Sequence, residues 1–188
     1  MTKAETLKYL SIKFGKKINI PKFFFLTMQQ FNDNYLSLFK KIKILFKDKS
    51  IIIRSSSISE DMKSLSNAGM YDSVVLEELN LVNLKKAIIK ITKKFKSKKD
   101  QILIQEFIAK PDISGVLFTR DINSNAPYYI INYDKSWKTN LVTSGKKNHS
   151  LKEVIFFKNK KISSKKFLKL INLTKKIENL FKNDRLDI

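Results

Sequence analysis

Three consecutive isoleucines, Ile51–Ile53, are followed at once by Arg54 and three serines. A short β-branched run of this kind is typical of a buried strand. Ser57 and Glu60 stand at the S-x-x-E spacing of a capping box, which predicts that a helix begins directly after the strand. Such a junction is a natural place for a phosphate group, because free backbone N–H groups and the helix dipole both favour anions.

Two interpretations of Arg54 follow from this segment alone. Its guanidinium could offer a fixed fork of donors to a phosphate. Equally, it could pair with a nearby carboxylate while the serines only cap the helix, and Glu60 is expected to be a cap rather than a catalytic acid. The loop Ser66–Ser73 contains Gly69, one of only 4 glycines in the chain. Access of a ligand to the backbone or a positive φ would explain this glycine, and a simple turn is the alternative.

Apolar periodicity divides the chain into helices and strands. Helical spacing covers residues 3–14, 29–46, 84–95 and 164–181. The strand candidates are residues 21–27, 51–53, 102–107, 115–119, 128–133, 140–143 and 154–158. A meander of strands followed by a helix suggests an α+β lobe. The polar segment Lys96–Asp100 is the expected lobe boundary, which gives an N-terminal lobe over 1–98 and a second lobe over 99–188.

The charge balance raises the question of nucleic-acid binding. The net charge is +21, from 38 basic and 17 acidic residues, but Arg54, Arg120 and Arg185 are the only arginines. Proteins that read bases usually rely on arginine forks. Because the lysines are scattered along the chain, a solvated lysine surface is favoured over a nucleic-acid groove.

Other compositional features bear on location. The chain has no cysteine, which excludes disulfides and thiolate metal sites and suits a reducing compartment. No apolar stretch approaches the ~20 residues that span a bilayer, and the N-terminus lacks the apolar core of a signal peptide. We therefore expect a cytoplasmic protein without a membrane partner.

Two segments, Ile53–Asp61 and Ser66–Ser73, together resemble the V-R-S-S-A-x-x-E-D and S-x-A-G-x-x-D-T motifs of the phosphoenolpyruvate synthase and pyruvate phosphate dikinase family. Rifampin phosphotransferase and the glucan-water dikinases share its ATP-grasp-like module. Further segments are similar to family motifs in the family's order: Thr2–Leu7 (G-G-K-A-x-x-L), Ile20–Phe24 (P-x-G-F), Ile104–Ile108 (V-Q-x-M-V), Ser114–Asp121 (S-G-V-x-F-T-x-D) and Val142–Gly145 (V-x-S-G).

The resemblance implies the N-terminal portion of a two-lobed, α+β, ATP-grasp-like nucleotide-binding domain. It implies that Lys3 and Arg54 act on the triphosphate as catalytic residues, and that Gly69 and Ser73 belong to a phosphate-covering loop. The adenine strand would comprise Gln105, Glu106, Phe107 and Ile108. Gln105 could instead be an ordinary strand residue, and Phe107 and Ile108 core residues. The implied cofactors are ATP and Mg²⁺.

The chain also departs from the family pattern. The opening glycines are missing before Lys3, and Asp134–Trp137 replaces the family's G-L-G-E loop, which leaves open whether this loop contacts nucleotide. Asp184–Ile188 looks like the approach to the D-I-E strand, so the metal-binding glutamate and a histidine-carrying domain are expected after residue 188. His149 lies in a polar turn without the context of the family's phosphate-accepting histidine, and an exposed loop residue is expected there.

The implied function is that of an ATP-dependent phosphotransferase or dikinase. The intact protein would pass a phosphoryl group from ATP through the histidine domain to a small acceptor such as pyruvate. The acceptor could instead be a metabolite or an amino-acid amide such as glutamine in surface-polysaccharide synthesis. The fragment alone is expected to be inactive. The alternative is a non-enzymatic, lysine-rich module that binds nucleic acid or anionic surfaces.

Overall fold

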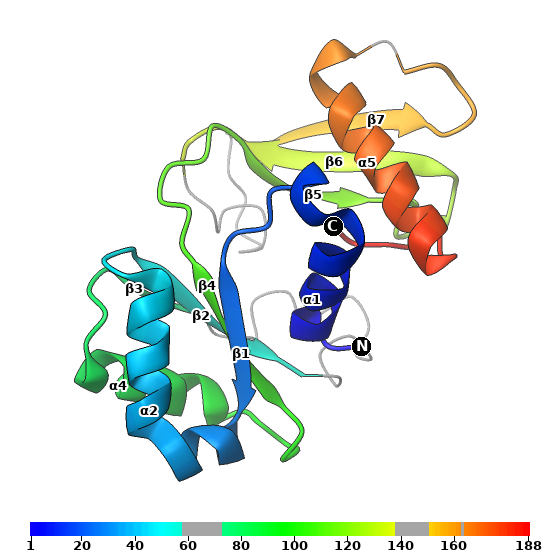
Figure 1. The fold of residues 1–188 in the computed structure, drawn as a ribbon. Coiled ribbons are helices and arrows are strands. Elements are labelled where there is room, and N and C mark those ends of the chain that lie inside the picture. Colours follow the sequence, from blue (N-terminus) through cyan, green and yellow to red (C-terminus); the bar gives the residue numbers. More distant parts are fainter. Residues whose placement is uncertain (58–72, 138–150, 163) are drawn as a thin grey trace. The chain divides into compact units, whose positions relative to one another are not determined.

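The computed structural model describes residues 1–57, 73–137, 151–162 and 164–188. The chain divides into two compact units, Met1–Ile108 and Ala109–Ile188, each of which is described by itself. Both combine helices with an antiparallel sheet, so the protein is of mixed α and β structure (Figure 1). Within the described residues, no helix has both the length and the apolar character needed to cross a bilayer.

The first unit alternates helices with short strands. Its elements are α1 (Lys3–Phe14), the 3₁₀ turn η1 (Gly15–Lys17), β1 (Phe23–Thr27), α2 (Met28–Phe46), β2 (Ile51–Ser56), β3 (Ser73–Leu76), α4 (Leu81–Thr92) and β4 (Gln101–Glu106). Capping explains the beginnings of the long helices. Thr2 and Thr27 each form a complete capping box, with Glu5 and Gln30 respectively, and the Asn80 side chain accepts the Asn83 N–H.

The four strands of the first unit form one antiparallel sheet in the order β1-β4-β2-β3. β4 is therefore an inner strand, although it comes last in the unit's sequence. Its residues pair with β1 from Phe23↔Gln105 to Thr27↔Gln101 and with β2 from Ile51↔Glu106 to Ser56↔Gln101. The expected lobe boundary at 98/99 is therefore wrong, because β4 completes the first sheet; the division falls after Ile108.

One face of this sheet is covered by α2 and α4 (Figure 1). The isoleucine run alternates between the two faces, with Ile51 and Ile53 fully buried in the core and Ile52 only partly buried. The core of the unit consists of Leu26, Phe31, Ile42, Phe46, Ile51, Ile53, Leu84, Ala87, Ile88, Ile91, Ile102 and Ile104. The opposite face carries the alternate residues of each strand. We call it the uncovered face because α2 and α4 do not pack on it, although Ser56, Leu103 and Gln105 on this face are buried.

The second unit is a three-stranded antiparallel sheet with one long helix. Its elements are β5 (Ser114–Phe118), β6 (Tyr128–Asp134), β7 (Lys152–Phe157) and α5 (Lys165–Phe181), with strand order β5-β6-β7. Phe167 and Ile171 of α5 join Leu117, Tyr129, Ile131 and Tyr133 of the sheet in the core. Gly115 is required by the close approach of β6, because a Cβ at this position would lie 2.4 Å from the Asn132 carbonyl oxygen.

The last residues of the chain lie along the outer edge of β5. Leu117 and Ile188 exchange backbone hydrogen bonds of 2.8 and 3.0 Å, and the Thr119 N–H donates to the Leu186 carbonyl. Phe118 and Asp187 form an isolated antiparallel bridge here, and the likeness of Asp184–Ile188 to the approach to the D-I-E strand stays a prediction. The strand expected at 140–143 and the turn with His149 lie outside the described residues.

Candidate functional site

The uncovered face of the first sheet carries three of the described residues that the family resemblance singles out, Arg54, Ser73 and Gln105. Directly paired residues of antiparallel strands point to the same face. Arg54 is paired with Leu103 of β4 and with Ser73 of β3, and Leu103 is paired with Phe25 of β1. These side chains therefore form one row across the sheet.

A second row lies about 7 Å further along the strands. It consists of Phe23, Gln105, Ile52 and Val75, which are paired across the four strands in that order. Gln105 is buried, with 8% of its surface exposed, whereas Val75 on the edge strand is 40% exposed. The row places a side-chain amide next to the ring of Phe23, which is a polar group beside an apolar surface.

Arg54 is exposed, although it is flanked along β2 by the buried residues Ile53 and Ser55. Its neighbour Ser73 is exposed as well. Arg54 and Ser73 are nineteen positions apart in the sequence, so the close pairing of the two could not be read from spacing. The arrangement places a guanidinium and a hydroxyl side by side on an accessible part of the sheet.

The N-terminus of α1 is tied to the same face. The Ala4 N–H donates to the Ser56 hydroxyl at 2.9 Å, and the Thr2 hydroxyl donates to Gln101 Oε1 at 2.6 Å. Ser56 and Gln101 form the third row of this face, since they are paired and lie two residues beyond Arg54 and Leu103. Lys3 lies between Thr2 and Ala4, so the helix start brings its backbone next to the row that contains Arg54.

Most of the first N–H groups of α1 already have partners within the protein. The Thr2 N–H donates to the Glu5 carboxylate and the Glu5 N–H to the Thr2 hydroxyl, and the Ala4 N–H is bonded to Ser56. The Thr2 N–H bond also holds the pKa of the Glu5 carboxyl below its usual value. An anion at this end of the sheet would therefore be held by the cationic side chains Lys3 and Arg54 rather than by these amides.

The four residues expected in an adenine strand differ in their surroundings. Gln105 faces the uncovered side, whereas Glu106 pairs with Ile51 on the helix-covered side and forms an ion pair with Lys49. The backbone N–H groups of Glu106 and Phe107 donate to the carbonyls of Lys22 and Ser50. Ile108, which is 52% exposed, ends the first unit. The side chain of Gln105 is thus the member of this set that shares a face with Arg54.

Sequence reasoning missed a buried carboxylate beside the expected phosphate segment. Asp100 accepts the Ser57 hydroxyl at 2.5 Å through Oδ1 and the N–H groups of Lys96 and Ser97 through Oδ2. It is only 5% exposed. These contacts fix the end of β2 against the turn before β4. The helix that Ser57 and Glu60 were expected to begin lies outside the described residues, as does Gly69.

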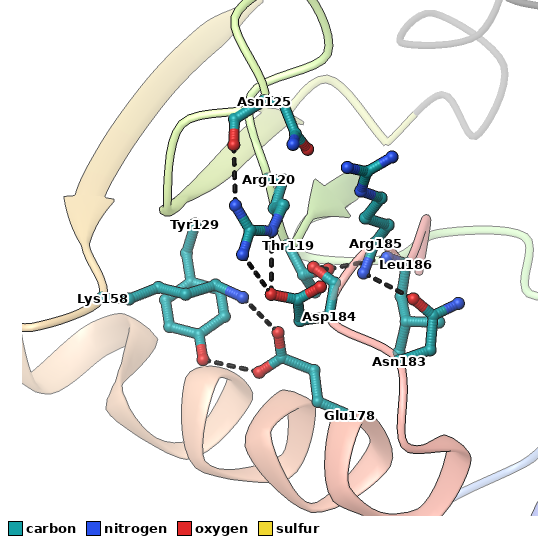
Figure 2. Close-up of polar contacts among 10 residues, drawn as sticks. All are labelled: Thr119, Arg120, Asn125, Tyr129, Lys158, Glu178, Asn183, Asp184, Arg185 and Leu186. Atoms are coloured by element: carbon teal, nitrogen blue, oxygen red, sulfur yellow. Dashed lines mark hydrogen bonds and ion pairs between the residues drawn. The ribbon is translucent and has the colours of Figure 1, made fainter.

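The second unit holds a separate polar cluster around the end of α5 (Figure 2). Glu178 accepts the Tyr129 hydroxyl at 2.7 Å and forms an ion pair with Lys158. Burial, reinforced by the nearby Glu178 carboxylate, raises the pKa of Tyr129. In Figure 2 the carboxylate of Glu178 lies between the ammonium of Lys158 and the phenol of Tyr129. The geometry of this cluster suits a structural role, because the charges of Lys158 and Glu178 are paired with each other.

The neighbouring arginine fastens the end of the chain. Arg120 donates to the Asp184 carboxylate and to the Asn125 carbonyl, and the Thr119 hydroxyl donates to the Asp184 carbonyl at 2.7 Å (Figure 2). The hydrogen bond from Arg120 lowers the pKa of Asp184. Asp134, at the start of the loop that departs from the family pattern, accepts the N–H of Ser136.

The Mg²⁺ that the resemblance implies would need oxygen ligands such as carboxylates. In the described ranges, no three His, Cys, Asp or Glu side chains converge as a metal site would require. Glu5 and Asp100, which accept hydrogen bonds from the side chains of Gln101 and Ser57, are also occupied by backbone N–H groups of the protein. We therefore assign no metal ligand here and derive no step through the metal.

The chain matches no protein-family model. No curated protein sequence matches it either. The arrangement of the residues on the uncovered sheet face is therefore the observation that bears on function.

Proposed function

We propose that this chain is the nucleotide-binding part of an ATP-dependent phosphotransferase, with an ATP-grasp-like fold and with ATP lying on the uncovered face of the first sheet. One observation carries the proposal. Segments around Lys3, Arg54, Ser73 and Gln105, which lie far apart in the sequence, are brought to one face of one sheet. Two of them provide cations and one provides an amide beside an apolar row.

The charges of this face suit a triphosphate. Phosphoryl transfer depends mainly on positioning and on the stabilisation of negative charge, so cations that are already in place contribute most. Arg54 would bind phosphate oxygens through its planar fork, and Lys3 would add a point charge from the start of α1. When bound with the nucleotide, Mg²⁺ would neutralise further phosphate charge.

The row that contains Phe23 and Gln105 suits the binding of the nucleotide base. Gln105 offers both a donor and an acceptor, and Phe23 offers an apolar ring about 7 Å along the strands from the row of Arg54. Most nucleotide sites combine apolar walls with a few polar groups that fix the orientation of the ligand. Lys3 and Arg54 are thus proposed to hold the phosphates, and Gln105 to lie near the base.

The complete reaction goes beyond the residues described. We propose a cytoplasmic enzyme in which a histidine-carrying domain receives the phosphoryl group and delivers it to a small acceptor. Pyruvate is one candidate acceptor, and an amino-acid amide such as glutamine is another. The binding of ATP can be measured whichever of these acceptors is used.

Calorimetric titration with ATP and Mg²⁺ tests the proposal on the whole chain. Arg54→Ala should weaken ATP binding at least about tenfold, because charge-assisted hydrogen bonds of this type contribute roughly 1.5–3 kcal/mol. Arg54→Lys should recover little of the loss, since a point charge does not reproduce a two-pronged contact. Arg185→Ala, which removes the same side chain from the second unit, is the matched control.

The melting temperature of each variant separates binding from structure. Arg54 is exposed, so its removal should leave the melting temperature within a few degrees of the wild type. If folded Arg54→Ala binds ATP as the wild type does, the uncovered face is not the nucleotide site. If its melting temperature falls while binding per folded molecule is unchanged, Arg54 is a structural residue.

A further inference from the structure

The two helices that cover the first sheet point their polar sides in the same general direction. α2 contacts β1 and β4, and α4 contacts β2, β3 and β4, so both lie on the same face of the sheet (Figure 1). Lys85 of α4 lies over the ring of Tyr35 of α2 at 5.4 Å, which shows that the helices are neighbours. The surfaces opposite their buried sides therefore form the outer side of one helical layer.

A stripe of lysines and aliphatic residues runs along the outer side of α2. It consists of Leu36, Lys40, Lys43 and Ile44, at the i, i+4, i+7 and i+8 spacing of one helix face, together with Lys47, which follows at the C-cap. Ile44 is 76% exposed and Leu36 is 53% exposed. Because the buried residues of α2 occupy the opposite side, this pattern cannot be part of the core.

The same pattern recurs on α4. Val82, Lys86, Ile89 and Lys90 follow the same i, i+4, i+7 and i+8 spacing along the helix, together with Lys93 at its C-cap. Val82 is 60% exposed and Ile89 is 43% exposed. These residues also lie opposite the buried side of their helix. Two neighbouring helices thus each present three lysines and two exposed aliphatic side chains.

The stripes contain no compensating negative charge. α4 has no acidic residue, and Asp33, the only one in α2, comes before the kink at Asn34. Across the part of the chain that the structure describes, none of the six lysines of the stripes forms an ion pair. The layer therefore combines a concentrated positive charge with apolar groups that are in contact with water.

We propose that the outer surface of α2 and α4, formed by the two stripes, docks on an anionic lipid bilayer. Lysine stems lie along apolar material while their ammonium groups reach the headgroups, and aliphatic side chains enter the boundary between headgroups and acyl chains. Each lysine near an anionic bilayer contributes a favourable electrostatic term. This proposal replaces the sequence-based expectation of no membrane partner.

The residue types favour a bilayer over nucleic acid. Single-stranded nucleic acid is bound by aromatic platforms together with arginine, whereas the stripes contain only lysine and aliphatic residues. Tyr35, which precedes Leu36 in the sequence and is partly exposed, has the ammonium of Lys85 over its ring. Leu36, Ile44, Val82 and Ile89 would gain little from phosphates but would gain from the removal of apolar surface from water.

Co-sedimentation with vesicles tests the proposal. The whole chain should bind vesicles that contain phosphatidylglycerol and should not bind vesicles of phosphatidylcholine alone. A charge variant, Lys43→Gln, Lys47→Gln, Lys90→Gln and Lys93→Gln, should reduce partitioning by at least about tenfold. An apolar variant, Ile44→Asn with Ile89→Asn, should reduce it about fivefold without changing the net charge.

The control removes an equal charge elsewhere. Lys165, Lys169, Lys175 and Lys176 are exposed on α5, and their change to Gln should reduce partitioning far less than the charge variant does. Equal losses from both quadruple variants would mean that net charge alone drives binding, which would overturn the proposal. It would also be overturned if the apolar variant bound vesicles normally, or if a DNA oligonucleotide bound more tightly than the vesicles through the same lysines.

Discussion

Two cationic side chains of this protein occupy opposite environments. Arg54 is exposed on the uncovered face of the first sheet, whereas Lys158 is largely buried against Glu178 and the ring of Tyr129. An exposed cation stays hydrated, so its charge adds little to the free energy of the folded state, and it is accessible to a ligand. A buried cation must be paired, because removal of a charge from water costs several kcal/mol.

This contrast predicts the effect of breaking the Lys158–Glu178 pair. Glu178→Leu would leave the Lys158 ammonium without its counter-ion and the Tyr129 hydroxyl without its acceptor. We expect the free energy of unfolding to fall by about 3 kcal/mol. Chemical denaturation at neutral pH measures this loss.

A triple variant provides the control for the same cluster. Lys158→Met, Tyr129→Phe and Glu178→Leu together remove every group that needs a partner, and should restore the free energy of unfolding to within about 1 kcal/mol of the wild type. A triple variant as unstable as Glu178→Leu would show that packing around α5, and not the unpaired charge, limits stability.

At the scale of the element, the start of α1 depends on a titratable group. The Glu5 carboxylate accepts the Thr2 N–H, which lowers its pKa in the folded state. A lowered pKa means that the ionised form adds stability above the pKa of the unfolded chain, and that this stability is lost as the pH falls through the folded pKa. The cap should therefore weaken in acid.

Glu5→Gln isolates this contribution. The variant should melt below the wild type near neutral pH, and the difference should disappear between about pH 5 and pH 3, where glutamate becomes protonated. Melting curves at a series of pH values measure it. Glu77→Gln, an exposed acidic residue between β3 and α4, is the control and should show no such change. A difference for Glu5→Gln that persists in acid would assign the effect to geometry instead of charge.

The elements were largely predictable from the sequence, and their pairing was not. Apolar spacing predicted α1 over Lys3–Phe14 with the observed bounds. This was possible because apolar residues recur every three or four positions on the buried side of a helix. The position of β4 between β1 and β2 depends on contacts between distant segments, which local periodicity does not contain. The polar residues of Lys96–Asp100 predicted a lobe boundary there. Asp100 is nevertheless buried, since hydrogen bonds satisfy both of its oxygens.

The candidate site shows the same limit. The exposure of Arg54 could be anticipated from the polar residues that follow Ile53, but the strand was expected to end at Ile53, whereas β2 continues to Ser56 and Arg54 lies inside it. Its pairing with Ser73, and the position of Lys3 beside Ser56, arise from the register of β2 and from the Ala4 hydrogen bond. Glu106 and Gln105 are adjacent in sequence but point to opposite faces, so a strand assignment made without its register could not separate them.

At the scale of the whole molecule, the division after Ile108 predicts how the chain can be cut. A fragment of residues 1–108 retains all four strands of the first sheet and should fold, whereas residues 1–98 lack β4, which pairs with both β1 and β2. Circular dichroism with thermal melting should show a cooperative transition for the longer fragment only. A cooperative transition for residues 1–98 would show that β4 is dispensable for the first unit.

The inner position of β4 also affects how the sheet can form while the chain is being synthesised. The sheet needs β4 between β1 and β2, yet a ribosome releases β1 first, and 73 residues separate Thr27 from Gln101. At synthesis rates of about 5–20 residues per second, the phenylalanine-rich β1 waits roughly 4–15 seconds before its partner strand is made. During this interval the nascent chain exposes an unpaired apolar segment to every other chain in its neighbourhood. Its risk of misassembly is therefore greatest during translation, before the stability of the finished sheet can protect it.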